Sequence, residues 1–166
     1  MTDTPKRYVR AFQLGCIEPD RNPTTYLKGS FRSQWLRGHN YGNAKRYMFR
    51  ISRRLERKDR LNLLDYYTLG KLIHYTTDAF TYAHNAEFSS NLGDHMEYEV
   101  ALQDHFLDYM RTSPSVSESG AESIMEAIRV YHREYIHKPA NIHTDTKYAL
   151  KACCCVLALL LTPRII

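Results

Sequence analysis

Apolar residues recur every three to four positions along most of this chain, which is the spacing of amphipathic helices. The clearest stripe lies in residues 43–57 and is formed by Ala44, Met48, Ile51 and Leu55. Comparable patterns predict further helices over residues 6–16, 62–82, 94–110, 120–137 and 144–161. No stretch shows the strict alternation of a half-buried strand over a useful length. The sequence therefore predicts an all-α fold, a compact multi-helix bundle.

Two features interrupt the helical pattern near the N-terminus. Pro19 biases Glu18 away from the α region, so residues 15–20 are predicted to end the first helix in a turn. Residues 21–42 are rich in Asn, Pro, Thr, Gly and Ser and are predicted to form a long loop. Loops of this length within a compact domain are usually functional, so the segment is a candidate contributor to a site.

A glycine stands in the middle of the predicted helix over residues 62–82. At such a position Gly70 costs roughly 1 kcal/mol relative to alanine. We expect the close approach of a neighbouring helix, or of a loop from a metal site, to offset this cost.

The composition is that of an ordinary globular protein. The 166 residues are 43% hydrophobic and 25% charged, which excludes global disorder and suits one domain over residues 1–166. The formal net charge of +5 and the isoelectric point near 9.0 favour anionic partners. Phospholipid surfaces, nucleic acid and small phosphate esters all meet that description, and the charge does not choose among them.

Much of the basic charge falls on one predicted helix. The side opposite its apolar stripe carries Arg46, Arg50, Arg53, Arg54 and Arg57. Two interpretations remain open, a solvated face that keeps the protein soluble and an electrostatic surface for lipid headgroups or nucleic acid.

The arrangement of the cysteines and the length of the apolar runs bear on the cellular compartment of the protein. Three of the four cysteines are adjacent, at 153–155, and on a helix they point in different directions. This arrangement fits neither a disulfide framework nor a zinc knuckle, so we interpret them as reduced core residues. Met1–Pro5 shows no apolar signal region, and the run Ala152–Leu161 is half the length of a membrane span of about 20 residues. We expect no transmembrane segment and a cytoplasmic protein, or a secreted one if the N-terminus has been trimmed.

The candidate chemistry is concentrated in residues 74–99. His74 and Asp78 are four residues apart, as are His95 and Glu99, and on a helix this spacing places both side chains of a pair on one face. Imidazole nitrogen and carboxylate oxygen are donors that zinc accepts, and His84 adds another. One such pair is common by chance, but two pairs with a histidine between them indicate a metal site.

These residues resemble the metal-binding signature of the zinc-dependent phospholipase C and P1 nuclease superfamily. Its pattern reads His, three residues, Asp, five residues, His, a variable insert, then His, three residues, Glu, and all five positions match. The resemblance implies a bundle of the phospholipase C/P1 nuclease type. The implied ligands of one zinc are Asp20, His39, His74 and Asp78. The implied ligands of a second zinc are His84, His95 and Glu99.

The resemblance also implies an activity. The chain would be a zinc-dependent phosphoric ester hydrolase, phospholipase C-like, with a metal-activated water as nucleophile. Asp20, at the end of a Gly-x-x-x-Pro-Asp segment that the family uses to deliver a ligand, is the candidate catalytic residue that takes the proton of this water. The substrate would be a phosphate ester, such as a phospholipid headgroup at a membrane surface, and nucleic acid stays open.

The sequence departs from the family pattern in one serious respect. The family holds a third zinc with the bridging Asp, an early His and a mature N-terminal Trp, whereas here no histidine precedes His39 and the chain starts with Met1. We therefore expect a bundle that lacks the N-terminal ligand-bearing segment, with two zinc ions and a third left open. Two alternatives remain, a P1-like single-strand nuclease and a non-catalytic, metal-stabilised helical binding protein.

Overall fold

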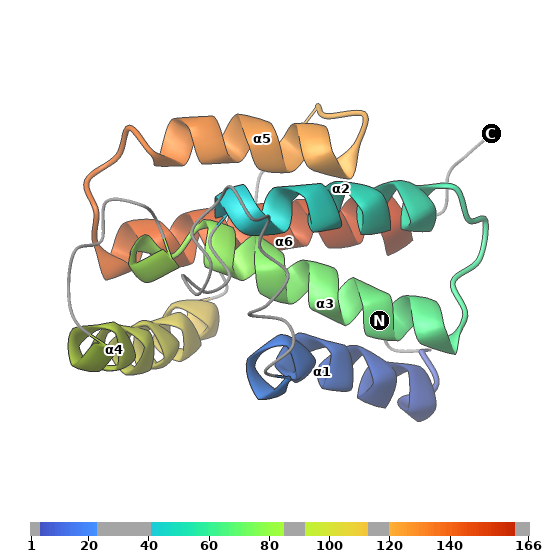
Figure 1. Ribbon diagram of the computed structural model, residues 1–166, viewed down its shortest axis with the longest axis horizontal. Coiled ribbons are helices and arrows are strands. Elements are labelled where there is room, and N and C mark those ends of the chain that lie inside the picture. Colours follow the sequence, from blue (N-terminus) through green and yellow to red (C-terminus); the bar gives the residue numbers. More distant parts are fainter. Residues whose placement is uncertain (1–3, 23–40, 85–91, 113–119, 162–166) are drawn as a thin grey trace. The chain divides into compact units, whose positions relative to one another are not determined.

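The computed structural model describes residues 4–22, 41–84, 92–112 and 120–161, apart from the side chains of residues 43 and 92–95. Within these ranges the chain forms six α-helices and a short 3-10 helix, and it contains no strand. The elements are α1 (Lys6–Arg21), α2 (Tyr41–Glu56), α3 (Leu63–Ala79), η2 (Tyr82–His84), α4 (Leu92–Arg111), α5 (Ile124–Tyr135) and α6 (Ile142–Leu161) (Figure 1). The predicted all-α class is confirmed.

The chain divides into two compact units, which are described separately. The N-terminal unit covers Met1–Thr76 and the C-terminal unit covers Thr77–Ile166. The assignment of all 166 residues to a single domain stays a prediction. None of the described helices is long and apolar enough to cross a membrane.

In the N-terminal unit, α2 buries the stripe that the sequence predicted. Ala44, Met48, Ile51 and Leu55 are each at most 7% exposed. Tyr47 also contacts α3, where its ring packs edge-on against that of Tyr75 with centroids 5.4 Å apart. The 3.6-residue period of the sequence therefore gave both the position and the buried face of this helix.

The first helix runs further than predicted. It ends at Arg21 rather than before a turn at 15–20, and Pro19 lies buried inside it. The bias of a residue before proline is a local preference that tertiary contacts can override. Here the last turn is held by a hydrogen bond from Asn22 N to Glu18 O and by an ion pair of 2.6 Å between Glu18 and Lys71.

The close approach expected at Gly70 is present, and the partner is α1. A Cβ atom added to Gly70 would overlap the carbonyl oxygen of Phe12 and lie 2.8 Å from the backbone nitrogen of Cys16. The Cα of Gly15 would be 2.9 Å away. The two glycines thus allow the backbones of α1 and α3 to come into contact. Any side chain at Gly70 would force the two helices apart.

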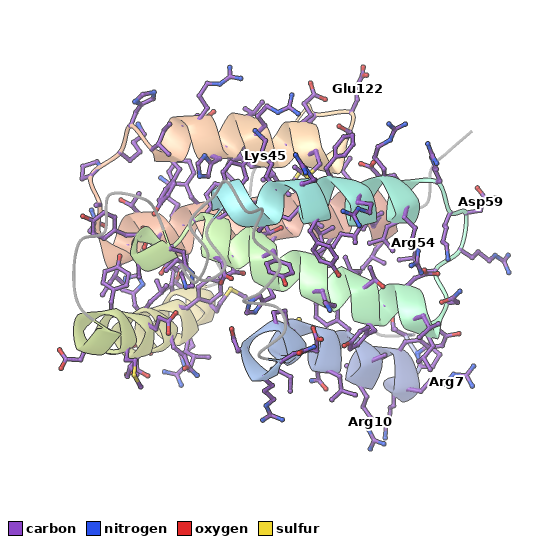
Figure 2. The ribbon with its side chains drawn as sticks, in the orientation of Figure 1. Arg7, Arg10, Lys45, Arg54, Asp59 and Glu122 are labelled. Atoms are coloured by element: carbon purple, nitrogen blue, oxygen red, sulfur yellow. The ribbon has the colours of Figure 1, made fainter. Side chains whose placement is uncertain are left out.

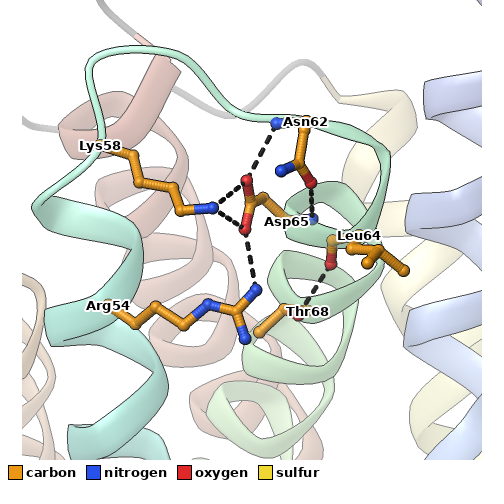
Figure 3. A network of polar contacts seen from close by, with 6 residues as sticks. All are labelled: Arg54, Lys58, Asn62, Leu64, Asp65 and Thr68. Carbon is orange, nitrogen blue, oxygen red and sulfur yellow. Dashed lines mark hydrogen bonds and ion pairs between the residues drawn. The ribbon is translucent and has the colours of Figure 1, made fainter.

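A buried carboxylate joins α2 to the start of α3. Asp65 is fully buried and accepts hydrogen bonds from Lys58 at 2.6 and 2.7 Å and from Arg54 at 3.1 Å (Figure 3). It also accepts from the backbone N–H of Asn62, whose own side chain accepts from Asp65 N–H, so the pair caps the helix reciprocally. Burial by itself raises the pKa of Asp65, but these donors outweigh it and hold the pKa below its ordinary value.

In the C-terminal unit, α6 packs against both α5 and α4, and α4 also contacts η2. The inner face of α5 is the predicted one, formed by Ile124, Ala127, Ile128, Tyr131 and Tyr135. Phe80, fully buried after the end of α3, packs edge-on against Tyr135 with centroids 5.5 Å apart. The cysteines at 153–155 are reduced, and Cys155 is buried as predicted while the other two are half-buried.

Candidate metal centre

The contact between α1 and α3 brings the first pair of candidate ligands together. Figure 1 shows α1 running beside α3, and the two glycines allow this closeness. One position further along α3, Lys71 pairs with Glu18 at 2.6 Å, and one turn after Gly70 Nε2 of His74 lies 3.4 Å from Oδ1 of Asp20. The contact between α1 and α3 therefore brings the carboxylate of Asp20 close to the imidazole of His74. This is possible because α1 continues to Arg21.

The two members of this pair differ in their access to water. The side chain of His74 is 10% exposed and packs edge-on against Tyr75, with ring centroids 5.4 Å apart. The side chain of Asp20 is 66% exposed. His74 is therefore held by its surroundings, while the carboxylate of Asp20 can be reached from solvent.

Asp78 lies on the same helix as His74, four residues later. The helix α3 is continuous through both positions, so the predicted one-turn spacing is present in the backbone. The side chain of Asp78 is 8% exposed. A buried carboxylate is expected to have an electrostatic or hydrogen-bonding role, because burying its charge is otherwise costly.

A second pair is formed in the C-terminal unit. Nε2 of His84, at the end of η2, lies 2.9 Å from Oε1 of Glu99 on α4, within hydrogen-bond distance. The side chain of His84 is 15% exposed and that of Glu99 is 45% exposed. The family resemblance implied that these residues hold the same ion, and the structure brings them side by side.

Sequence reasoning missed a buried carboxylate behind this pair. Asp145, in the first turn of α6 and fully buried, accepts three hydrogen bonds. The backbone N–H of Tyr82 and the hydroxyl of Tyr98 donate to Oδ2, each at 2.7 Å, and the hydroxyl of Tyr135 donates to Oδ1 at 2.8 Å. Burial raises the pKa of Asp145, and the hydrogen bonds oppose this rise without cancelling it. Burial, together with the bond to Asp145, also raises the pKa of Tyr98.

Two of the predicted ligands cannot be compared with the structure. His39 lies outside the described residues, and His95 lies on α4 with its side chain outside them. Among the side chains that are described, no group of three His, Cys, Asp or Glu is arranged to hold a metal ion. The complete ligand sets, and with them the number of ions, therefore stay predictions.

The two described pairs nevertheless suit zinc. Each joins an imidazole nitrogen to a carboxylate oxygen, the donor chemistry of catalytic zinc sites. Two ligand atoms bound at about 2.0–2.1 Å to a tetrahedral ion lie roughly 3.3 Å apart. The separations of 3.4 Å in the first pair and 2.9 Å in the second lie within a few tenths of an ångström of that value.

Two other described histidines, His105 and His132, make contacts of a structural kind. Nδ1 of His105 lies 3.0 Å from the hydroxyl of Thr146, and its ring stacks on Tyr109. His132 packs edge-on against Phe80 with centroids 5.8 Å apart. Neither contact involves a candidate ligand, so we do not include these two histidines in the metal site.

Comparison with known proteins identifies a family for this chain. The model of the family described as zinc dependent phospholipase C matches residues 2–142, a range that includes every candidate ligand. No curated protein sequence and no solved structure matches the chain. The match covers most of the chain and extends over both pairs. The chain therefore belongs to the zinc-dependent phospholipase C family and is a phosphoric ester hydrolase that depends on zinc.

Proposed function

We propose that this protein hydrolyses the phosphodiester that joins the headgroup of a phospholipid to its diacylglycerol. The observation that carries the proposal is the pair of imidazole–carboxylate contacts, His74 with Asp20 and His84 with Glu99, within the segment matched by the family. Both contacts present nitrogen and oxygen donors at spacings that suit one zinc each. The products would be a diacylglycerol and a phosphorylated headgroup.

The ligands proposed for the two ions follow from the sequence pattern and the two contacts. One ion would be held by Asp20, His39, His74 and Asp78. The other would be held by His84, His95 and Glu99. When bound, zinc would polarise the phosphoryl oxygens and lower the pKa of a coordinated water toward about 7.

Asp20 is the proposed general base. Its carboxylate is 66% exposed, and the oxygen that does not hold the ion can accept a proton from the water that attacks phosphorus. As the new oxygen–phosphorus bond forms, the bond from phosphorus to the glycerol oxygen breaks. The proton taken by Asp20 is then available to the leaving alkoxide, so no charge accumulates on the protein over a cycle.

Three substrates assayed in parallel test this proposal. With zinc bound, vesicles of phosphatidylcholine are expected to release diacylglycerol, and a chromogenic phosphodiester is expected to be cleaved more slowly. Chelation with EDTA should stop both reactions and added zinc should restore them, because the metal supplies charge stabilisation that no side chain replaces.

The remaining outcomes distinguish the alternatives. Cleavage of single-stranded DNA without release of diacylglycerol would replace the lipid substrate with a nucleic acid. Stoichiometric zinc without turnover on any of the three substrates would leave a metal-stabilised binding protein.

A further inference from the structure

One segment of this chain is strongly basic. Residues 41–57, which include α2, contain Lys45 and the arginines at 46, 50, 53, 54 and 57, against one acid, Glu56. These six cations less one carboxylate account for a net charge of +5, which is the formal charge of the whole protein. The other 149 residues carry 17 basic and 17 acidic side chains, and are neutral as a set. That neutrality is an average, because residues 1–40 carry seven basic and three acidic side chains, so residues 41–57 are the most densely basic segment and not the only one.

All six cationic side chains are exposed. At 100° per residue, Arg46, Arg50 and Arg53 lie opposite the buried stripe of α2, and Lys45 and Arg54 lie on its two flanks. Arg57 follows the last residue of the helix. Figure 2 labels Lys45 and Arg54 near the two ends of α2. Arg54 remains 53% exposed although it bonds to Asp65. Between the cations lies Phe49, which is 45% exposed, with the guanidinium of Arg53 5.7 Å from its ring centroid. This basic face therefore combines cations with one accessible aromatic ring.

We propose that the basic face of α2 docks on the surface of an anionic bilayer. Lysine and arginine near such a surface are attracted by the negative potential of its headgroups, and the attraction adds up over the cations that reach it. An exposed aromatic ring amid cations suits the boundary between headgroups and acyl chains. A membrane is favoured over nucleic acid because the proposed substrate of the same chain is a phospholipid, and this step rests on the proposed function.

A matched pair of triple variants tests the docking surface. The first replaces Arg46, Arg50 and Arg53 by glutamate, and it leaves Arg54 in place because that residue bonds to Asp65. The control replaces Arg129, Arg133 and Lys147 by glutamate. These residues are exposed cations of α5 and α6, so the net charge changes by the same amount. Sedimentation with phosphatidylcholine vesicles, with and without phosphatidylserine, measures binding.

The wild type and the control are expected to bind the vesicles that contain phosphatidylserine, and the α2 variant is expected to bind at least about tenfold more weakly. Added salt should weaken the binding of the wild type. An equal loss in both variants would overturn the proposal, since net charge alone would then explain binding. Retention on single-stranded DNA but not on vesicles would also overturn it. Hydrolysis of a soluble phosphodiester by the wild type tests the proposed function separately.

A different observation supports a second inference, from the three hydrogen bonds that Asp145 accepts. Two of them lead to the pair of candidate ligands. Tyr82 begins η2, two residues before His84, and Tyr98 immediately precedes Glu99 on α4. The third bond leads to Tyr135 on α5, a helix with no predicted ligand. The carboxylate of α6 therefore ties together the two elements that carry the pair.

We infer that Asp145 is a positioning residue for His84 and Glu99. Its Oδ2 fixes the start of η2 through the backbone of Tyr82 and fixes one turn of α4 through the hydroxyl of Tyr98. Groups that hold metal ligands in place from behind typically change metal affinity or activity by 10–100-fold when removed. Asp145 lies three residues beyond the segment matched by the family model, and so it is a feature of this chain outside that match.

Two variants that each delete one hydroxyl separate positioning from simple stability. Tyr98→Phe removes the link to α4, and Tyr135→Phe removes a bond of nearly the same length to the same carboxylate. Zinc affinity is measured by competition with a chelator. Amide hydrogen exchange is measured on peptides that cover residues 82–84 and 96–99, because exchange reports local order whether or not zinc is bound.

Tyr98→Phe is expected to weaken zinc binding by about 10–100-fold and to accelerate exchange in both peptides. Tyr135→Phe is expected to change neither by more than about twofold, although it lowers the melting temperature. Equal effects of the two variants on exchange would show that Asp145 stabilises the fold in general and does not position His84 and Glu99. If His84→Ala leaves the zinc content unchanged, the ligand assignment in the proposed function fails, and the exchange data still decide whether Asp145 orders the two segments.

Discussion

Replacement of His84 by alanine is expected to lower kcat/KM on a soluble phosphodiester by at least about 10³-fold, because loss of several kcal/mol of charge stabilisation corresponds to that factor. One zinc per chain should be lost with it. The helical circular dichroism should persist, since His84 ends a three-residue helix and the buried Phe80 and Ala83 beside it are unchanged. Elemental analysis, steady-state kinetics and circular dichroism of the same preparation measure the three quantities.

An exposed histidine provides the control. His137, just after α5, is exposed and does not fit the predicted ligand spacing. His137→Ala should keep the zinc content and the turnover of the wild type. Undiminished activity in His84→Ala would remove the second ion from the mechanism, and loss of helical signal would show that His84 supports the fold instead.

The sequence predicted the helices well because most of them bury one face. In α2 and α5 the apolar stripes identified the buried residues correctly, as the 3.6-residue period is a local property of the chain. The end of α1 was predicted incorrectly because the local preference at Pro19 opposes contacts with α3 that the sequence does not display. Gly70 signalled a close approach, but only the structure identified Gly15 as the partner.

The candidate site divides in the same way. The spacing from His74 to Asp78 is local, and the backbone of α3 reproduces it. The contact between Asp20 and His74 depends on the packing of α1 against α3. The resemblance to a family suggested that these two residues act together, whereas their spacing in the sequence did not. Asp145 could not be found from the sequence, because its donors Tyr82 and Tyr98 lie 63 and 47 residues away and no pattern connects them.

Replacement of Asp65 by alanine is expected to lower the free energy of unfolding by about 2–4 kcal/mol, the sum of a lost helix cap and lost charge-assisted hydrogen bonds. The upper values reported for broken buried ion pairs, about 3–5 kcal/mol, assume that the orphaned charge stays buried. Here the side chains of Lys58 and Arg54 are 31% and 53% exposed and can be rehydrated, which moderates the loss. Urea unfolding followed by circular dichroism at pH 7 measures the difference.

The effect should depend on pH with a definite sign. Because the pKa of Asp65 is lower in the folded than in the unfolded protein, its ionised form stabilises the fold above the unfolded pKa of about 4. This contribution is lost as the pH falls through the folded pKa, since the carboxylate is then protonated in both states. The difference in stability between wild type and Asp65→Ala should therefore shrink as the unfolding experiment is repeated at decreasing pH below about 5.

Asp59 supplies a control in the same connection between α2 and α3. Its side chain is exposed, as Figure 2 shows, so Asp59→Ala should change the unfolding free energy by no more than about 0.5 kcal/mol. Asp65→Asn keeps the shape but removes the charge, and it should fall between the wild type and the alanine variant. If Asp65→Ala is as mild as Asp59→Ala, or if its effect is the same at pH 7 and in acid, the ionised carboxylate does not hold α2 and α3 together. The alanine variant keeps only the hydrogen bond from the backbone N–H of residue 65 to Oδ1 of Asn62 at the start of α3.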